Sequence, residues 1–217
     1  MRERPILFSA PMVRAILDGS KTQTRRVVKP QPSRELMTEY ECIRQSRLSA
    51  RTDAEILSDC LLCPYGIPGD RLWCRETFAI VPRTAYARSE GVQQMLRPDD
   101  DHDAAIYRAG WDRSNGGFRW RPSIHMPRWA SRILLEIVSV RVERLQDISE
   151  DDARAEGIAY SERFEGYCTG EAEHFNSHDP RQSYFSLWEA INGAGSVAAN
   201  PWVWVVEFKR IDVAEGS

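Results

Sequence analysis

Segments with strong β propensity open and close this chain, and no repeated strand–helix–strand unit lies between them. These segments combine β-branched, aromatic and aliphatic residues in short or alternating runs. They cover residues 5–9, 22–28, 71–78, 133–145 and 202–208. This order favours a mixed or antiparallel arrangement over a doubly wound parallel sheet, which needs regular alternation of strands and helices.

Three predicted helices interrupt the strands. Residues 11–18 carry apolar side chains at helical spacing, and Gly19 follows as an end signal. Ser149 precedes an acidic first turn, which predicts a helix that Gly157 ends. Residues 180–192 form the third. We therefore predict an α+β protein, a small mixed β-barrel with peripheral helices.

We expect a single domain over residues 1–217, because a chain with 42% hydrophobic residues can bury one sizeable core. Three segments have loop-like or polar composition and are interpreted as large insertions, at about 30–63, 79–131 and 159–180. No apolar run approaches the ~20 residues of a membrane span. We expect a cytoplasmic protein with no membrane association and with reduced cysteines.

Charge is unevenly distributed along the chain. The net charge of −3 argues against a bulk polyanion binder, so nucleic-acid binding would need a local basic patch. Residues 108–132 carry six basic groups and one acidic group, with tryptophans between the arginines, whereas residues 146–189 carry eleven acidic and three basic groups. This pattern fits a site for an anionic or nucleotide-like ligand, and equally an ordinary solvated surface.

Cysteines and histidines raise the question of a metal site. Cys60 and Cys63 have the spacing of a zinc knuckle, and Cys42 and Cys74 could complete a set of four ligands. His174 and His178 are four residues apart in a loop-like segment. Because a second closely spaced cysteine pair is missing from the sequence, we favour buried thiols and expect no metal and no cofactor.

Residues 19–26 combine a lysine, two threonines and two arginines directly after a helix end. A threonine hydroxyl is a weak nucleophile until a base takes its proton, and a lysine can be that base if burial lowers its pKa. Lys21 and Thr24 would face opposite sides of a regular strand, so they can cooperate only if the chain turns between them. A basic β-turn without a chemical role is the alternative interpretation.

Glu156 is the last predicted helical residue before Gly157. A carboxylate at this position opposes the negative end of the helix dipole, where a cation would be favoured. The placement indicates either a tuned functional carboxylate or simply a good helix former.

Several motifs together resemble the ASCH domain, a β-barrel family related to the PUA RNA-binding domain. In chain order they are a helix before Gly-x-Lys-Thr-x-Thr-Arg-Arg, then Pro-Gly-Asp-Arg-Leu-Trp, a helix with Ala-x-x-Glu-Gly, and Trp-Val-Val-Glu-Phe. The resemblance covers about residues 5–29, 64–78, 133–158 and 184–210, and it is to the longer, phage-type members.

The resemblance also implies an activity, because characterised bacterial relatives are small amidohydrolases that deacylate N4-acetylcytidine. Their triad falls by motif position on Lys21, Thr24 and Glu156. It implies Thr24 as the nucleophile, Lys21 as its general base, and Glu156 as the group that orients Lys21 or shuttles protons. The expected partner is a modified cytidine nucleoside or RNA, with no obligatory protein partner, and we expect a monomer.

We expect substrate-binding residues around this triad. Arg25 or Arg26 would hold the acyl oxygen or the polar edge of the substrate, and one of Trp73, Trp111 or Trp120 would stack on the base.

The predicted geometry is specific. Lys21 should be largely buried, and the Thr24 hydroxyl should lie within ~2.6–3.2 Å of it. The helix beginning near Ser149 should aim its C-terminal end at this turn.

Two other classes of function stay open. An RNA-binding module or an ASCH-type ribonuclease without amidohydrolase activity would use the basic, tryptophan-bearing residues 108–132. A phage-encoded structural or regulatory protein that kept the fold without the chemistry is the third possibility.

Overall fold

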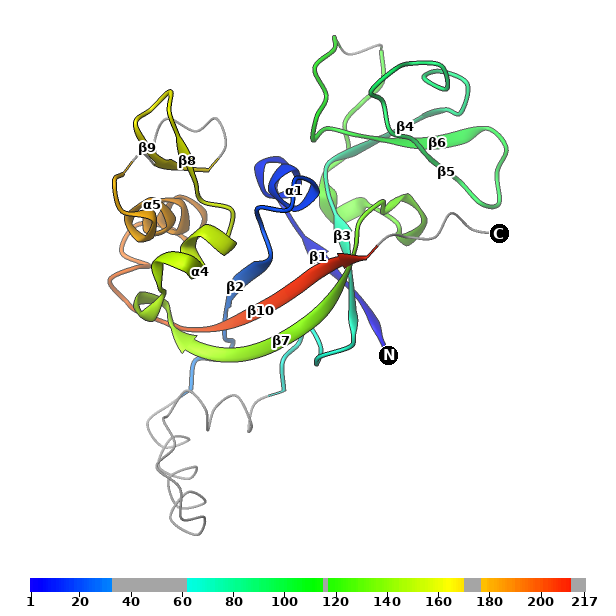
Figure 1. Cartoon of the computed structure of the whole chain (residues 1–217). Helices are drawn as coiled ribbons and strands as arrows, with labels where there is room; N and C mark the ends of the chain where they lie inside the picture. The colour runs from blue at the N-terminus through cyan, green and yellow to red at the C-terminus, as the bar shows by residue number, and fades with distance from the viewer. Residues whose placement is uncertain (33–61, 115–116, 170–176, 212–217) are drawn as a thin grey trace. The chain divides into compact units, whose positions relative to one another are not determined.

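The computed structural model describes residues 1–32, 62–114, 117–169 and 177–211 (Figure 1). Within these residues the chain forms three α-helices, three short 3-10 helices and ten strands. This confirms a fold that mixes α-helices and β-strands. The model contains no helix, within the described ranges, that is both long enough and apolar enough to cross a membrane.

Five strands form the largest sheet, in the order β1-β3-β7-β10-β2. Their bounds are Glu3–Leu7 for β1, Gln23–Val27 for β2, Arg71–Arg75 for β3, Leu134–Arg144 for β7 and Trp202–Ile211 for β10. β1 pairs in parallel with β3, whereas β3 with β7 and β10 with β2 are antiparallel. Two smaller sheets have the orders β4-β6-β5 and β8-β9. They are built from β4 (Phe78–Pro82), β5 (Met95–Leu96), β6 (Asp103–Tyr107), β8 (Ala159–Ser161) and β9 (Gly166–Cys168).

In the described part of the chain the sheets are open, so the predicted β-barrel is wrong. The order of the large sheet ends at β1 on one side and at β2 on the other. A closed barrel would require these two edges to pair. The chain instead leaves β1 directly into helix α1 (Ala10–Leu17), so no tight hairpin joins the two edge strands.

The chain divides into two compact units. The first contains Met1–Gly19, Asp70–Glu136 and Lys209–Ser217, and the second contains Ser20–Gly69 and Ile137–Phe208. The predictions of a single domain and of three insertions stay predictions. The segment 30–63 lies almost entirely outside the described residues, 79–131 contains most of the β4-β6-β5 sheet, and 159–180 contains the β8-β9 pair.

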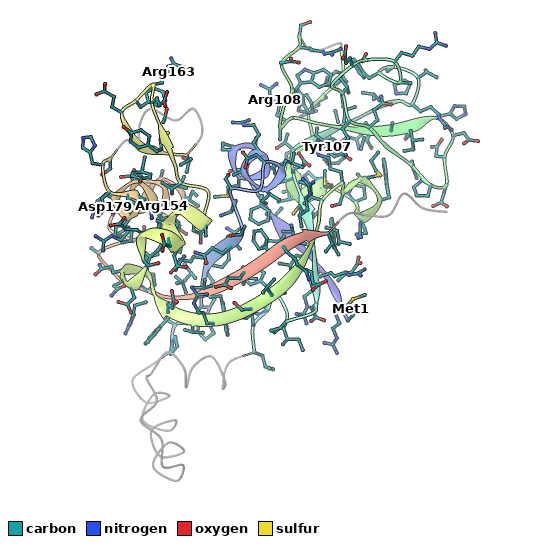
Figure 2. The ribbon with its side chains drawn as sticks, viewed as in Figure 1. Met1, Tyr107, Arg108, Arg154, Arg163 and Asp179 are labelled. Carbon is teal, nitrogen blue, oxygen red and sulfur yellow. The ribbon has the colours of Figure 1, made fainter. Side chains whose placement is uncertain are left out.

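Local sequence explains the ends of the helices in the second unit. In α4 (Glu150–Ala155), the Ser149 hydroxyl accepts a hydrogen bond from the Asp152 N–H at 3.0 Å, and Gly157 follows with a φ of 95°. Asp179 begins α5 (Pro180–Asn192) by accepting from the Arg181 N–H at 2.8 Å. Figure 2 labels Asp179 at this helix and Arg154 on α4. The predicted helix start at Ser149 is confirmed. The helix ends at Ala155, and Glu156, predicted as its last residue, is the C-cap before Gly157.

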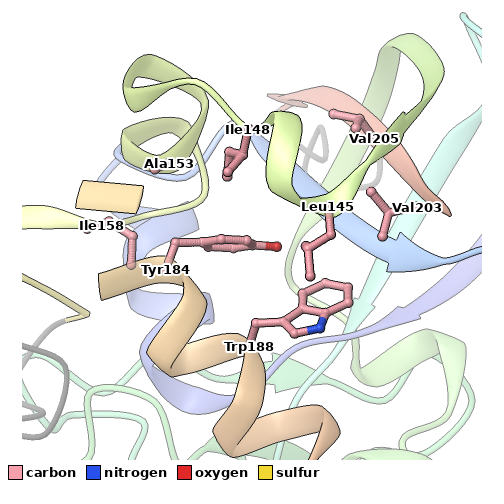
Figure 3. Close-up of a cluster of buried hydrophobic side chains, with 8 residues drawn as sticks. All are labelled: Leu145, Ile148, Ala153, Ile158, Tyr184, Trp188, Val203 and Val205. Atoms are coloured by element: carbon pink, nitrogen blue, oxygen red, sulfur yellow. The ribbon is translucent and has the colours of Figure 1, made fainter. Parts of the chain in front are cut away.

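The core of the second unit lies between α4, α5 and β10 (Figure 3). Tyr184 and Trp188 project from α5 toward Leu145, and toward Val203 and Val205 on β10. All five side chains are buried. This packing fixes α4 and α5 on one face of β10, because its alternate residues point to the same side of a strand.

The first unit has its own small core on the β4-β6-β5 sheet. Phe78 and Tyr107 pack with Met126 and Ala130, which come from the segments around the 3-10 helices η1 (Ser123–His125) and η2 (Arg128–Ala130). Residues 79–131, interpreted from their composition as a loop-like insertion, supply β5 to this sheet. The difference arises because a two-residue strand leaves no recognisable period in the sequence.

Candidate active site

Lys21 and Glu156 form a buried ion pair in the second unit. Lys21 Nζ donates to Glu156 Oε2 at 2.7 Å and to the Glu156 main-chain oxygen at 2.8 Å. Their side chains are 0% and 4% exposed. The two residues also pair through their backbones as an isolated antiparallel bridge, and the Thr22 N–H donates to the Ala155 oxygen at 2.9 Å. The C-terminal end of α4 therefore points at residues 21–22, as predicted.

Burial makes the Lys21 ammonium easier to deprotonate. Removal from water lowers the pKa of the Lys21 ammonium below its ordinary value, and the neighbouring charges of Arg26 and Arg25 lower it further. The ion pair with Glu156 opposes this shift without reversing it. A lysine in such an environment is a better proton acceptor near neutral pH than an exposed lysine.

Arg25 is the second buried cation at this place. Its side chain is 0% exposed and contacts three carboxylates. The distances from its terminal nitrogens are 3.0 Å to Glu143 Oε2, 3.2 Å to Asp152 Oδ2 and 3.5 Å to Glu156 Oε1. These three carboxylates engage both its NH1 and its NH2 group. The role of Arg25 as a substrate ligand stays a prediction.

Arg141, Glu143 and Asp152 also belong to this site, and the sequence did not predict them. Arg141 Nε donates to Glu143 Oε1 at 2.5 Å and its NH2 lies 3.2 Å from Asp152 Oδ1, while its NH1 contacts Glu207. The sequence contains one signal for the contact between Arg141 and Glu143, because residues two apart on a strand share a face. Which carboxylates meet Arg25 could not be inferred without the tertiary arrangement.

Asp152 links helix α4 to β2. The Gln23 side-chain amide donates to its main-chain oxygen at 2.8 Å. Partial burial alone would raise the pKa of the Asp152 carboxyl, but Arg25, the Ser149 and Gln23 hydrogen bonds and Arg141 together hold it below its ordinary value. Asp152 is therefore ionised at neutral pH and serves as a fixed negative charge.

Thr24 is buried on β2, with 2% exposure, and pairs with Val206 of β10. Neighbouring residues of a strand point to opposite faces, so Thr24 faces away from the side of β2 that carries Arg25. β2 begins at Gln23, and the main-chain oxygen of Thr22 still accepts a hydrogen bond from the Phe208 N–H of β10 at 2.8 Å. The hydrogen bond between Thr24 and Lys21 stays a prediction.

An open pocket of about 330 Å³ adjoins the buried pair. Thr22 and Ala155, the chain neighbours of Lys21 and Glu156, belong to its wall. The remaining lining residues are Gln23, Val138, Asp151, Asp152, Glu207 and Phe208. Its acidic lining suits a neutral or cationic ligand better than an anion.

The remaining predicted site residues are Arg26 on β2 and three tryptophans of the first unit. Arg26 is half-buried and pairs with Trp204 across the β2–β10 ladder. Trp73, Trp111 and Trp120 belong to the first unit, so a shared site with Lys21 stays a prediction. Trp111 packs on Trp120 with ring centroids 5.5 Å apart, and Trp73 lies below the guanidinium of Arg75 at 5.5 Å.

Metal ligands do not gather in the described residues, where no group of three or more suitable side chains occurs. Cys63 is half-exposed and Cys74 is buried, and neither belongs to a disulfide in the described part of the chain. Cys42, Cys60 and His174 lie outside the described residues.

Comparisons of this chain with known protein families, with curated proteins and with solved structures gave no match.

Proposed function

We propose that this chain is an amidohydrolase that deacylates N4-acylated cytosine nucleosides. The observation that carries the proposal is the buried Lys21–Glu156 pair, at 2.7 Å, in which burial lowers the pKa of the lysine. The resemblance to the PUA-like ASCH family supports it, because that family places its proposed base and carboxylate at these two positions. We expect it to act as a cytoplasmic monomer.

The proposed reaction has two steps. Lys21, as the neutral amine, takes the proton of the Thr24 hydroxyl while Thr24 Oγ1 bonds to the acyl carbon. The bond between the acyl carbon and N4 then breaks, and the proton passes from Lys21 to N4, which releases cytidine. Water deprotonated by Lys21 hydrolyses the acyl-threonine ester, and this yields the free acid and restores Thr24.

Glu156 holds the Lys21 amine in place through both of its acceptors. Its carboxylate and its main-chain oxygen fix Nζ from two directions. Because Lys21 is enclosed, its position depends on α4 rather than on solvent. Glu156 is therefore the orienting group, and its carboxylate can receive a proton when Lys21 changes charge.

The test is release of cytidine from N4-acetylcytidine by the purified full chain, with and without a chelator. We expect chelator-insensitive turnover that is lost in Lys21→Ala, Thr24→Ala and Glu156→Ala. Lys209→Ala is the matched control, since Lys209 forms an exposed ion pair with Glu136. Absence of turnover on a series of N4-acyl cytidines would contradict the proposal.

A second candidate is RNA binding by the first unit. It is favoured by Arg108, which is exposed and is labelled in Figure 2. Its guanidinium lies 5.6 Å from the centre of the Trp120 ring, and the exposed Arg119 and Arg121 are near Trp120 in the sequence. The test is binding of a single-stranded RNA oligonucleotide across a salt series, with oligonucleotide integrity followed on gels to detect cleavage. Affinity that survives Lys21→Ala but falls in Arg119→Ala and Arg121→Ala would favour this function.

A further inference from the structure

Four charged side chains of the second unit form a closed ring of alternating sign. Asp152 uses Oδ2 toward Arg25 and Oδ1 toward Arg141, and Glu143 uses Oε2 toward Arg25 and Oε1 toward Arg141. Each carboxylate thus bridges the two guanidinium groups. Such a ring holds all four groups by more than one contact, which an isolated ion pair does not.

The ring connects the buried pair to the surface. Exposure increases stepwise, from 0% for the Arg25 side chain to 22% for Glu143 and Asp152 and 31% for Arg141. At its inner end Arg25 NH1 lies 3.5 Å from Glu156 Oε1, on the carboxylate that holds Lys21. In the described part of the chain Arg25 Nε has no hydrogen-bond partner, so the guanidinium is held through its two terminal nitrogens.

We propose that Arg25 is a positioning residue for the reaction described above. The ring fixes its guanidinium beside the Glu156 carboxylate that holds Lys21, where its positive charge opposes a proton on Lys21. The inference rests on the proposed function for its catalytic meaning. The electrostatic relation between Arg25 and Lys21 is independent of any substrate.

The sign of the effect follows from the charges that face Lys21. Arg25 and Arg26 on β2 disfavour a proton on Lys21, and Glu156 at the end of α4 favours it. From α5, the phenol of Tyr184 has its pKa raised well above its ordinary value by burial and by Glu156, so it stays neutral and adds no charge.

The outer members of the ring act with the opposite sign. Asp152 on α4 and Glu143 on β7 counter the charge of Arg25. Arg141 and its partner Glu207 on β10 lie farther out and are more exposed, so solvent screens them more strongly.

The sequence offers a direct probe, because the chain has only three lysines, Lys21, Lys29 and Lys209. Titration of the protein labelled with 13C and 15N in its lysines yields their pKa values by NMR, and Lys21→Arg identifies the signal of Lys21. We expect Arg25→Met to raise the midpoint of Lys21, because the variant removes one of the positive charges that disfavour its proton. Glu143→Gln should lower it by a smaller amount, and the Lys209 signal should not move.

Opposite shifts of the Lys21 midpoint in the two variants establish the proposal. Arg25→Met removes a positive charge and Glu143→Gln removes a negative charge, whereas loss of packing alone would not shift the midpoint in opposite directions. An unchanged Lys21 midpoint in both folded variants, or a shift in the same direction, overturns it. If Arg25→Met does not fold, Glu143→Gln supplies the test, and an unchanged Lys21 midpoint in that variant overturns the proposal.

These measurements need no substrate, so failure of the proposed function leaves them unaffected. If the protein does hydrolyse N4-acetylcytidine, the acid limb of kcat/KM should move in the same directions as the NMR midpoints. Activity with an acid limb that does not follow Lys21 would keep the hydrolase and refute the role of Arg25.

Discussion

Lys21 donates both to the carboxylate and to the main-chain oxygen of Glu156, a residue 135 positions later in the chain. The contact joins the segment before β2 to the C-terminal end of α4 at a place that water barely reaches. An ion pair taken out of water is stable only while both partners are present, because either charge alone would be left uncompensated.

Glu156→Gln should therefore reduce the free energy of unfolding by about 3 kcal/mol, the lower end of the range for removing one partner of a buried pair. Urea denaturation at pH 7 measures the change. Glu136→Gln is the matched control, because it removes the partner of Lys209 in an ion pair of 2.8 Å whose side chains are 60% and 33% exposed. Glu136→Gln should reduce the free energy of unfolding by less than ~1 kcal/mol, as is usual for ion pairs that solvent screens. Equal losses in the two variants would contradict the burial argument.

Asp152 should contribute to stability in a pH-dependent way. Its pKa is lowered in the folded protein, so its contribution is fully present above the unfolded value near 3.8 and is lost as pH falls through the lowered folded value. Asp152→Asn should be less stable than the wild type at pH 6, and the difference should shrink as the pH approaches 3. Urea denaturation at a series of pH values tests this, and a constant difference over that range would refute it.

Ser149→Ala should destabilise the protein by about 1 kcal/mol, because it removes the side-chain acceptor of the Asp152 N–H at 3.0 Å. The effect should be accompanied by weaker protection of the α4 amides in hydrogen exchange, since this helix has only six residues. Ser186→Ala on the exposed side of α5 is the control and should change stability by less than ~0.5 kcal/mol.

Trp111 should prove to be a packing residue of the first unit. Its ring makes edge contacts with Tyr86, Phe118 and Trp120 at centroid distances of 5.3, 5.3 and 5.5 Å. Trp111→Ala should lower stability by about 2 kcal/mol, less than for a fully buried tryptophan because its side chain is only half-buried. Thermal or chemical denaturation measures this.

Trp111→Phe is the informative comparison. It keeps an aromatic ring and removes the indole N–H, which has no hydrogen-bond partner among the described residues. We expect a cost under ~1 kcal/mol, since deleting an unsatisfied buried donor offsets lost packing. If Trp111→Ala left stability unchanged while it abolished RNA binding, the ring would be a stacking platform instead.

The sequence contains the signals for local structure but not for the ring around Arg25. Ser149 and Gly157 predict both ends of α4, because capping and a left-handed glycine act within a few residues. The proximity of Lys21 and Glu156 was expected from a family resemblance, and the pattern of residues alone left it open. Arg25 receives its carboxylates from β7 and α4, more than a hundred residues away, and local periodicity carries no information on that meeting.

The predicted barrel and the predicted stacking of tryptophans on a ligand both rest on patterns along the chain, which do not specify tertiary contacts. The strands were recognisable, but barrel closure depends on hydrogen bonding between β1 and β2, which no single strand encodes. The alternation of arginine with tryptophan in residues 108–132 suggested stacking on a ligand. It did not show that Trp111, Phe118 and Trp120 pack on one another.

The order of the large sheet has a consequence for synthesis of the chain. β2 leaves the ribosome early, yet its neighbour in the sheet is β10, with Val27 opposite Val203. Until β10 has been translated, the edge of β2 has no native strand to bind, and an unpaired edge is a template for pairing with other chains. Nascent protein stalled before residue 202 should therefore be the species most prone to aggregation and most dependent on chaperones.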